Sequence, residues 1–339
     1  MQSMRDLAIN ISRCIFSTCA VSMNYLLSIL GLASSGNSGL YNIGQTIHLK
    51  NMRVVISRHL ADGGFGSLYQ VIDSNNTNRQ YALKLLNCPT RDQVAEAHNE
   101  LKALQKCANH LNIIDLVDSN QVQSQNNNNT QILMLFPLYQ SGTVWDIVYN
   151  TRDNSPWPFG EQTAFQLVLG VVNGLMYMHT HGLSHCDIKP HTIMLSDKGV
   201  PVLIDLGSVW TCRRDISSRR DALMLEDEAS VKCSAPYRAP ELTTVTHPCV
   251  IDERIDIWSL GCTMYCIAFG YCPFETPKEG YSKLAVLNAR YTFPPDRRKN
   301  DCVFSTDYTN TIRSMLQLEA RNRPDTHDLE RSIRNILVV

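Results

Sequence analysis

The sequence has almost no net charge. Its 339 residues carry 31 basic and 32 acidic side chains, for a formal charge of −1 at pH 7. This balance gives no electrostatic attraction for nucleic acid, so we expect no nucleic-acid partner. The basic pairs at 213–214 and 219–220 and the acidic run at 226–228 are expected to be solvated faces. With 44% hydrophobic residues, the chain can bury a large core.

Cysteine pairs with the spacing of metal sites or disulfide frameworks are also missing. The 12 cysteines include no Cys-x-x-Cys motif and no His-Cys spacing suited to zinc. Neither a zinc knuckle nor a disulfide-rich scaffold is therefore indicated. We expect reduced thiols in a reducing compartment. Asn-x-Ser/Thr triplets begin at Asn10, Asn75 and Asn128, but they matter only in a secreted chain.

Two aspartates, Asp187 and Asp205, each lie beside a short predicted strand, at residues 193–195 and 202–204. A turn at residues 197–199 would join these strands into a hairpin. Phosphoryl transfer needs one carboxylate to orient the attacking hydroxyl and another to hold the magnesium ion on the phosphates. A His-x-Asp tripeptide alone is most often a solvated turn, so the accompanying motifs decide the assignment.

The stretch at residues 183–207 resembles the catalytic loop and metal-binding triplet of the eukaryotic protein kinases. The matching residues are His185, Asp187, Lys189, Pro190, Asp205 and Gly207. The resemblance implies that Asp187 and Lys189 are catalytic and that Asp205 binds a metal ion. Three positions differ from the family pattern: Cys186 replaces an arginine, Thr192 replaces an asparagine that binds metal, and Leu206 replaces a phenylalanine.

A glycine-rich turn is predicted between strands at residues 53–60 and 67–73. A backbone without side chains can approach phosphates closely, although such a turn alone is more often a simple hairpin. Ala61 occupies the first glycine position of the kinase pattern. The resemblance implies ATP contacts from Leu60, Ala61, Asp62, Gly63, Gly64, Phe65, Gly66 and Leu68.

Lys84 lies inside a strand predicted at residues 81–85, where a buried ammonium needs an acidic partner. The helix predicted at residues 91–107 offers Glu100, and Glu96, one turn earlier, is the competing choice. By resemblance, a Lys84–Glu100 pair holds the α and β phosphates of ATP. The other ATP contacts that the resemblance implies are Ala82, Phe136, Tyr139 and Met194.

Further motifs follow in the kinase order. Residues 161–181 have the apolar spacing of a helix that leads into the catalytic loop. Residues 208–238 match an activation segment in place and composition, and residues 121–130 are expected to be a polar loop. Glu241 belongs to an Ala-Pro-Glu motif whose glutamate pairs with an arginine, here Arg323.

The resemblance covers residues 50–335 and implies the bilobal α+β fold of protein kinases. We expect an N-terminal lobe at residues 45–137, with a small antiparallel β-sheet and one helix, and a mainly helical C-terminal lobe at 138–339. A helix starting at Asp256 would form the core of the larger lobe, and the last 70 residues are expected to be helical. The sequence leaves the oligomeric state open.

Within the superfamily, residues 237–242 and 250–262 resemble the Numb-associated kinases. Residues 142–145 and 205–208 are most similar to the small member of that family that carries N-terminal myristoyl and palmitoyl groups. The resemblance implies a serine/threonine kinase that uses ATP with Mg²⁺ or Mn²⁺ and phosphorylates proteins, including itself. It also implies a cytoplasmic protein held peripherally on Golgi or other intracellular membranes.

Residues 1–44 lie outside the kinase pattern. The run at 14–33 is apolar and uncharged, which is the outline of a secretory signal or a weak anchor, but it includes five Ser, Thr or Asn residues. Secretion, membrane association and a disordered or mis-started extension all remain open. Because the sequence begins Met1-Gln2, the glycine for myristoylation is missing, and Cys14 and Cys19 remain as candidate palmitoylation sites.

The departures from the kinase pattern allow a second reading, a pseudokinase scaffold that keeps the fold without transferring phosphate. Ala61 and Thr192 favour it, whereas the retained acidic and basic residues of the site favour activity. Without the arginine that Cys186 replaces, phosphorylation of the activation segment is expected to matter less. A dinucleotide-binding enzyme is excluded by context, because its glycine-rich turn leads into a helix and not into a strand.

Overall fold

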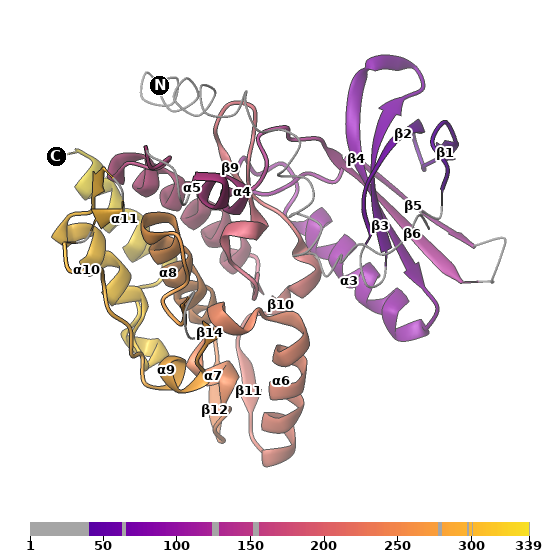
Figure 1. Cartoon of the computed structure of the whole chain (residues 1–339). Helices are drawn as coiled ribbons and strands as arrows, with labels where there is room; N and C mark the ends of the chain where they lie inside the picture. Colours follow the sequence, from indigo (N-terminus) through magenta and orange to yellow (C-terminus); the bar gives the residue numbers. More distant parts are fainter. Residues whose placement is uncertain are drawn as a thin grey trace.

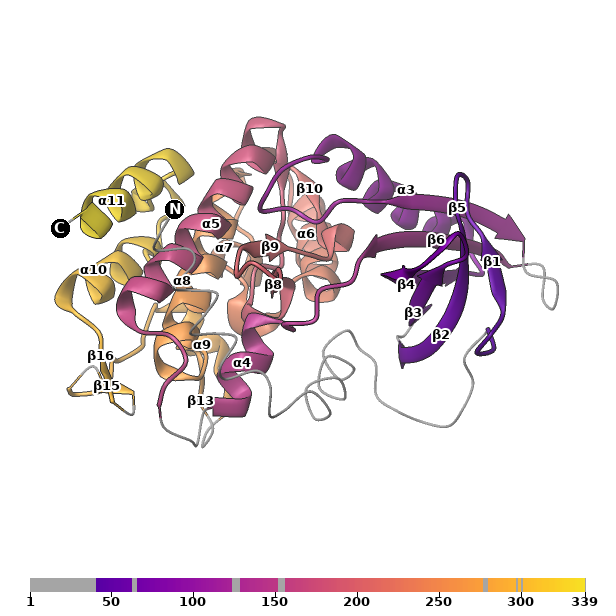
Figure 2. The ribbon, with the colours of Figure 1, turned by 90° about the horizontal axis from the view of Figure 1, so that it is seen from above.

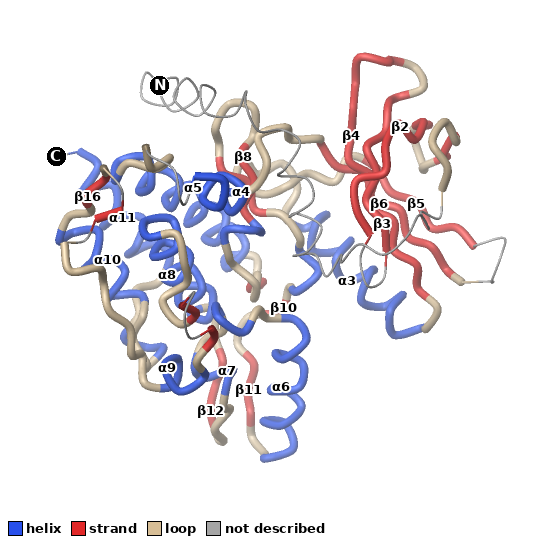
Figure 3. The backbone as a smooth tube through the Cα atoms, in the orientation of Figure 1, coloured by secondary structure: helices blue, strands red, loops and turns tan. Residues whose placement is uncertain are grey.

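The computed structural model describes residues 41–62, 66–123, 129–151, 156–276, 280–296, 298–299 and 301–338. In this part of the chain a β-sheet lobe lies beside a larger, mainly helical lobe (Figures 1 and 2). Strands gather in the smaller lobe and helices dominate the larger one (Figure 3). The expected bilobal α+β fold is therefore confirmed.

The smaller lobe is built on one antiparallel sheet with the strand order β1-β2-β3-β4-β6-β5. Its strands are β1 (Thr46–His48), β2 (Arg53–Asp62), β3 (Gly66–Asp73), β4 (Asn76–Cys88), β5 (Asp118–Gln123) and β6 (Thr130–Pro137). Buried and half-buried residues alternate along β3, as expected where one face of a strand covers a core. The polar loop expected at 121–130 is wrong in part, because β5 includes its first three residues.

Helix α3 (Arg91–Lys106) packs beside this sheet. It begins at a capping box, in which the Thr90 hydroxyl accepts from the Gln93 N–H and the Gln93 side chain accepts from the Thr90 N–H. Its buried face includes Ala97, Ala103 and Leu104, together with Glu100. The helix therefore brings one carboxylate into an otherwise apolar interface.

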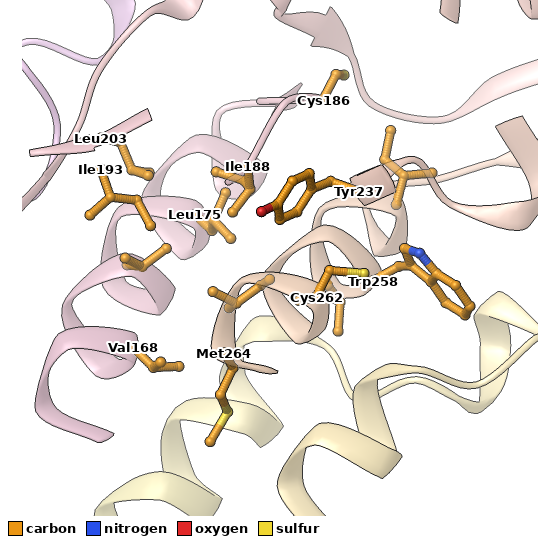
Figure 4. Close-up of a cluster of buried hydrophobic side chains, with 14 of the residues drawn as sticks. Val168, Leu175, Cys186, Ile188, Ile193, Leu203, Tyr237, Trp258, Cys262 and Met264 are labelled. Atoms are coloured by element: carbon orange, nitrogen blue, oxygen red, sulfur yellow. The ribbon is translucent and has the colours of Figure 1, made fainter. Parts of the chain in front are cut away.

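The larger lobe is centred on helix α8 (Arg254–Phe269), which is buried along almost its whole length. Figure 4 shows apolar side chains of α5 (Glu161–Thr180) and α8 meeting around Ile188 and Tyr237. Further helices are α4 (Val144–Thr151), α7 (Pro240–Thr243), α9 (Lys283–Leu287), α10 (Thr306–Met315) and α11 (Thr326–Val338). No helix in the described ranges is long and apolar enough to span a membrane; the apolar run at 14–33 lies outside them.

Short strands complete the larger lobe. They are β7 (Leu183–Ser184), β8 (Ile193–Leu195), β9 (Pro201–Leu203), β10 (Trp210–Thr211), β11 (Arg214–Ile216), β12 (Cys249–Ile251), β13 (Glu275–Thr276), β14 (Gly280–Tyr281), β15 (Arg298–Lys299) and β16 (Cys302–Val303). The hairpin predicted from the catalytic stretch forms between β8 and β9. The helical prediction for the last 70 residues is wrong in part, because β13, β14, β15 and β16 interrupt the helices.

The predicted pair of Glu241 and Arg323 forms with two parallel hydrogen bonds. The Arg323 Nη1 and Nη2 atoms donate to the two Glu241 carboxylate oxygens over 2.7 and 2.8 Å. The Arg323 side chain is fully buried and also lies over the Trp258 ring. This pair links the end of the activation segment to the helices at the C-terminus.

Replacing Glu241 with alanine is expected to lower the free energy of unfolding by about 3–5 kcal/mol, because the buried guanidinium loses its counter-charge. Urea unfolding followed by circular dichroism would measure the loss. The exposed Glu319 provides a control, since Glu319→Ala should change stability by less than about 0.5 kcal/mol. Equal stability of the two variants would show that the pair does not stabilise the fold.

Candidate active site

The catalytic loop is held in place by Asp256 at the start of α8. The Asp256 carboxylate accepts hydrogen bonds from the backbone N–H groups of His185 and Cys186, both over 2.8 Å. It also contacts Nε2 of His179 on α5 at 2.9 Å. These bonds support Cys186 in a left-handed backbone conformation, with φ of 70°, which is strained for a residue other than glycine.

Asp187 lies in this loop, and both of its carboxylate oxygens accept hydrogen bonds. Its Oδ2 accepts from the Lys189 ammonium over 2.7 Å, and its Oδ1 accepts from the Ser234 N–H over 2.8 Å. The Lys189 ammonium also lies 2.6 Å from the Ser234 hydroxyl oxygen. The side chain of Asp187 is therefore fixed in one orientation, and each of its oxygens keeps a further lone pair for a substrate proton.

Thr192, which replaces the metal-binding asparagine of the family pattern, is buried within the same loop. Its hydroxyl donates to the Asp187 carbonyl over 2.8 Å and accepts from the Lys189 N–H over 3.1 Å. One lone pair of this oxygen remains for another ligand. Thr192 thus connects the two backbone groups that flank Ile188, directly after Asp187.

Lys84 on β4 contacts two carboxylates from different parts of the chain. Its Nζ atom lies 2.7 Å from Glu100 Oε1 and 3.3 Å from Asp205 Oδ1. Of the two glutamates considered from the sequence, Glu100 is buried and makes the pair, whereas Glu96 is exposed. Since Asp205 belongs to the larger lobe, this cluster connects the two lobes.

The charges in this cluster shift one another's pKa values. Burial alone would lower the pKa of Lys84, but Glu100 and Asp205 together raise it. The Lys84 ammonium holds the pKa of Asp205 below its usual range, and the charge of Lys189 lowers it further. Burial raises the pKa of Glu100, and Lys84 offsets part of that effect. Asp205 is therefore ionised at neutral pH, as a metal ligand must be.

Asp205 has a left-handed backbone conformation, with φ of 62°. Two residues later, a Cβ on Gly207 would lie 3.4 Å from carboxylate oxygens of both Asp205 and Glu100. A Cβ there would make ordinary van der Waals contact with both carboxylates, so Gly207 lies directly beside the acidic groups. Leu206, between them, is buried in an apolar cluster that includes residues of both lobes.

The residues around the glycine-rich turn are placed mainly by the sheet. Ala61 pairs with Leu68 across β2 and β3, and with Leu60 they form a small apolar cluster. Asp62 Oδ1 accepts from the Ser67 hydroxyl over 2.7 Å, which ties the two strands together. Gly63, Gly64 and Phe65 lie outside the described residues.

The packing of the sheet requires glycine at position 66, independently of any ligand. A Cβ at this position would overlap the carbonyl oxygen of Leu85 on the neighbouring strand β4. Glycine is thus required for close pairing of β3 with β4. The sequence interpretation of Gly66 as part of an ATP contact is compatible with this constraint, which sequence reasoning missed.

The remaining expected ATP contacts lie near the connection between the lobes. Ala82 faces Phe136 across β4 and β6, and Tyr139 follows β6 and packs against the core. Met194 on β8 forms a β-bridge with Thr143, whose hydroxyl caps α4 by accepting from the Asp146 N–H. These residues come from both lobes, as a site between the lobes requires.

The activation segment contains a helix that sequence reasoning missed, α6 (Arg219–Lys232). A capping box of Ser218 and Asp221 starts it, and this Ser-x-x-Asp pattern is a recognised signal for a helix start. The prediction of solvated charges is wrong for Glu226, which accepts from the Val245 N–H over 2.7 Å. It is also wrong for Glu228, which accepts from Arg214 on β11 over 2.8 Å.

Besides Arg214, Lys232 also contacts the Glu228 carboxylate, at 3.3 Å. Because these two ion pairs hold the activation segment together without a phosphate group, Glu228 is a candidate for stabilising this segment without phosphorylation. Burial alone would raise the pKa of Glu228, but the charges and hydrogen bonds of Arg214 and Lys232 lower it below its ordinary value of 4.5. A carboxyl group with a lower pKa in the folded chain stabilises the fold above the unfolded-state pKa. That stabilisation is lost as the pH falls through the folded-state pKa.

Glu228→Gln is therefore expected to lower the free energy of unfolding by about 1 kcal/mol at neutral pH. The difference from the wild type should shrink as the pH falls below 4.5, because the wild-type carboxylate is then neutralised as well. Urea unfolding over a series of pH values would measure it, with the exposed Asp215→Asn as a control. A difference that stays constant with pH would contradict a role for the charge.

Sequence reasoning also missed Ser234 and Asp256 as parts of the site. Ser234 lies 47 positions after Asp187, and Asp256 lies 70 positions after Cys186. Neither has a local signal that identifies its partner. Both contacts depend on how α8 and the end of the activation segment fold against the catalytic loop.

Comparison with known proteins places these features in a family. The protein kinase domain family matches residues 54–332. Serine/threonine-protein kinase 16 of Homo sapiens is 32% identical over 280 residues, which cover 82% of this chain and 88% of the relative. Serine/threonine-protein kinase ENV7 of Saccharomyces cerevisiae is 27% identical over 342 residues, covering 84% of this chain and 92% of the relative.

Proposed function

We propose that the site for phosphate transfer in this chain is formed by Asp187, Lys189, Thr192 and Asp205. The chain belongs to the protein kinase family and is a serine/threonine protein kinase. The ion pairs of Lys84 with Glu100 and Asp205 carry this proposal. They join residues of both lobes in the arrangement that phosphoryl transfer requires.

Asp187 is the group that accepts the proton of the substrate hydroxyl. Its contacts with Lys189 and the Ser234 N–H orient the carboxylate before substrate binds, which lowers the entropic part of the barrier. The Lys189 ammonium balances negative charge beside the reacting oxygen. Lys84, held by Glu100, would face the phosphates of ATP from the opposite lobe.

The donors of Asp205 and Thr192 fit a magnesium ion. A carboxylate and a hydroxyl are hard oxygen ligands of the kind that Mg²⁺ prefers, and Thr192 keeps one free lone pair. A bound Mg²⁺ would neutralise charge on the phosphates. Mn²⁺, which accepts the same oxygen ligands, is the alternative ion. Asp205 supplies the negative charge, and Thr192 supplies a neutral second contact.

Thr192→Asn is expected to raise the turnover number by about 10-fold to 100-fold, because the amide oxygen is a stronger metal ligand than the hydroxyl. Thr192→Val should lower it by a similar factor, since the isosteric side chain cannot bind metal or accept from the Lys189 N–H. Steady-state rates over a range of Mg²⁺ concentrations would measure both. An unchanged rate in both variants would remove Thr192 from the metal site.

We also propose the finer assignments that the sequence resemblance implies. The chain divides into an extension at 1–44 and lobes at 45–137 and 138–339, which is supported by the end of the sheet at Pro137. Its place among the Numb-associated kinases is supported by residues 237–242 and 250–262 and by 32% identity to serine/threonine-protein kinase 16. ATP and proteins, including the chain itself, are the proposed substrates.

The proposed location is cytoplasmic, with peripheral attachment to Golgi or other intracellular membranes. The apolar run at 14–33 and the cysteines Cys14 and Cys19 support it. A single acyl chain gives only marginal membrane binding, so the apolar run has to contribute. Cell fractionation should find the full chain with membranes and the Cys14→Ser/Cys19→Ser variant released in part. Equal distribution of both would exclude palmitoylation as the anchor.

A further inference from the structure

Helix α6 lies at the outer edge of the larger lobe, beside β11 (Figure 1). One face of the helix is buried, through Ala222, Leu225 and Ala229. On the opposite face Leu223, Met224 and Val231 are exposed by 51%, 60% and 85%. Three large apolar side chains on one face of a surface helix indicate a contact surface.

The charged side chains of α6 fall into two groups. Asp221, Glu226, Glu228 and Lys232 have partners within the chain. For Arg219, Arg220 and Asp227, by contrast, the described residues provide neither an ion pair nor a side-chain hydrogen bond, and all three are exposed. Of these three, Arg220 and Asp227 lie on the face that carries the exposed apolar residues, whereas Arg219 lies about a quarter turn away from it.

The spacing of these residues makes the face self-complementary. Arg220 and Asp227 are seven residues apart, which is about two helical turns, so they lie on one side of the helix. Leu223 and Met224 lie midway between them. A second α6 that runs in the opposite direction would bring each arginine to an aspartate and the apolar residues of the two helices together.

We propose that α6 pairs with the α6 of a second copy of this chain, antiparallel and about a two-fold axis near Leu223 and Met224. In this arrangement Arg220 faces Asp227 of the partner subunit, and Asp227 faces Arg220 of the partner subunit. Each ion pair flanks the apolar contact at the axis. The occupant of the exposed face is thus another molecule of the same protein.

The length of the helix limits the strength of this contact. A helix of 14 residues is about 21 Å long and cannot bury the roughly 800 Å² per partner of a stable complex. A dissociation constant of about 10–100 μM is therefore expected. Because α6 belongs to the activation segment, the pairing would bring two activation segments together, as phosphorylation between copies requires. This consequence rests on the kinase activity, but the pairing itself does not.

Sedimentation velocity of the full chain without ATP tests the proposal. The weight-average sedimentation coefficient of the wild type should rise with concentration towards that of a dimer. Arg220→Asp and Asp227→Arg should each weaken association by at least about tenfold, since each places like charges opposite one another. The matched control Arg79→Asp, at an exposed position of β4, should leave it unchanged.

An equimolar mixture of Arg220→Asp and Asp227→Arg should associate again. At positions 220 and 227 the first variant has two acidic groups and the second has two basic groups, so only the mixed pair is complementary there. Met224→Glu should abolish association in every combination. Thermal unfolding followed by circular dichroism would confirm that each variant is folded.

A wild type that stays monomeric at all concentrations would overturn the proposal. So would a folded pair of single variants whose mixture fails to associate. Association that persists in Met224→Glu would place the contact on another surface and would also overturn it. Because no ATP is present, none of these results depends on catalysis.

Discussion

Asp205→Asn is expected to lower the rate of phosphate transfer by about a thousandfold or more. The asparagine keeps the size of the side chain but removes the negative charge that would hold the metal ion, and a metal ion supplies several kcal/mol of transition-state stabilisation. Each 1.36 kcal/mol corresponds to about a tenfold change in rate. Initial rates with labelled ATP and saturating Mg²⁺ would measure the loss.

The fold should survive this change, because Lys84 keeps its contact with Glu100. Asp197, which is exposed in the turn between β8 and β9, provides the matched control, and Asp197→Asn should transfer phosphate at the wild-type rate. If Asp205→Asn retained more than about a tenth of the wild-type rate, Asp205 would not be the main metal ligand.

Asp187→Asn is expected to lower the turnover number by about a hundredfold to ten-thousandfold, the usual contribution of a positioned general base. The amide can still accept from the Ser234 N–H, so the loop should keep its shape. It cannot accept a proton from the substrate hydroxyl. The Michaelis constant for ATP should change little, because this residue acts on the other substrate.

The combination of the two measurements separates the roles of the aspartates. With Asp187→Asn, ATP with Mg²⁺ should still raise the melting temperature as in the wild type, whereas with Asp205→Asn this shift should be reduced. If Asp187→Asn lost the ATP-induced shift and Asp205→Asn kept it, the assigned roles would be reversed.

The parts of the site that lie in continuous motifs could be predicted from the sequence. Lys84, Asp187 and Asp205 each stand in a short pattern, and the helical spacing of α3 limited the partner of Lys84 to two glutamates. The choice between them depended on which one α3 turns towards the sheet, and that choice follows from the burial of Ala97, Ala103 and Leu104 on the same face as Glu100. Packing, not the motif, decides it.

The parts that depend on distant contacts could not be predicted. Asp256 was expected only as the start of a helix, yet its carboxylate binds the backbone of the catalytic loop. Glu228 was expected to face solvent, yet α6 turns it towards Arg214. In each case the residue type allowed several roles, and the fold selected one of them.

The structure shows the surroundings of three residues that depart from the family pattern: Cys186, Ala61 and Thr192. Cys186 places a buried thiol in the core of the larger lobe (Figure 4), at the position where the family pattern has an arginine that pairs with a phosphorylated segment. Ala61 on β2 pairs with Leu68 on β3, directly after a shift of the pairing register between His59 and Ala61. Thr192 preserves the bonds of the catalytic loop to its own backbone. None of these substitutions disrupts the contacts of Lys84, Asp187 or Asp205.

The most direct test is phosphate transfer from labelled ATP by the full chain, to casein and to itself, with Mg²⁺ and Mn²⁺ in separate reactions. We expect transfer to serine and threonine, identified by phosphoamino-acid analysis, and its loss in Asp205→Asn. Absence of transfer with either metal, while ATP still raises the melting temperature, would contradict this account. It would leave a nucleotide-binding scaffold with the same fold.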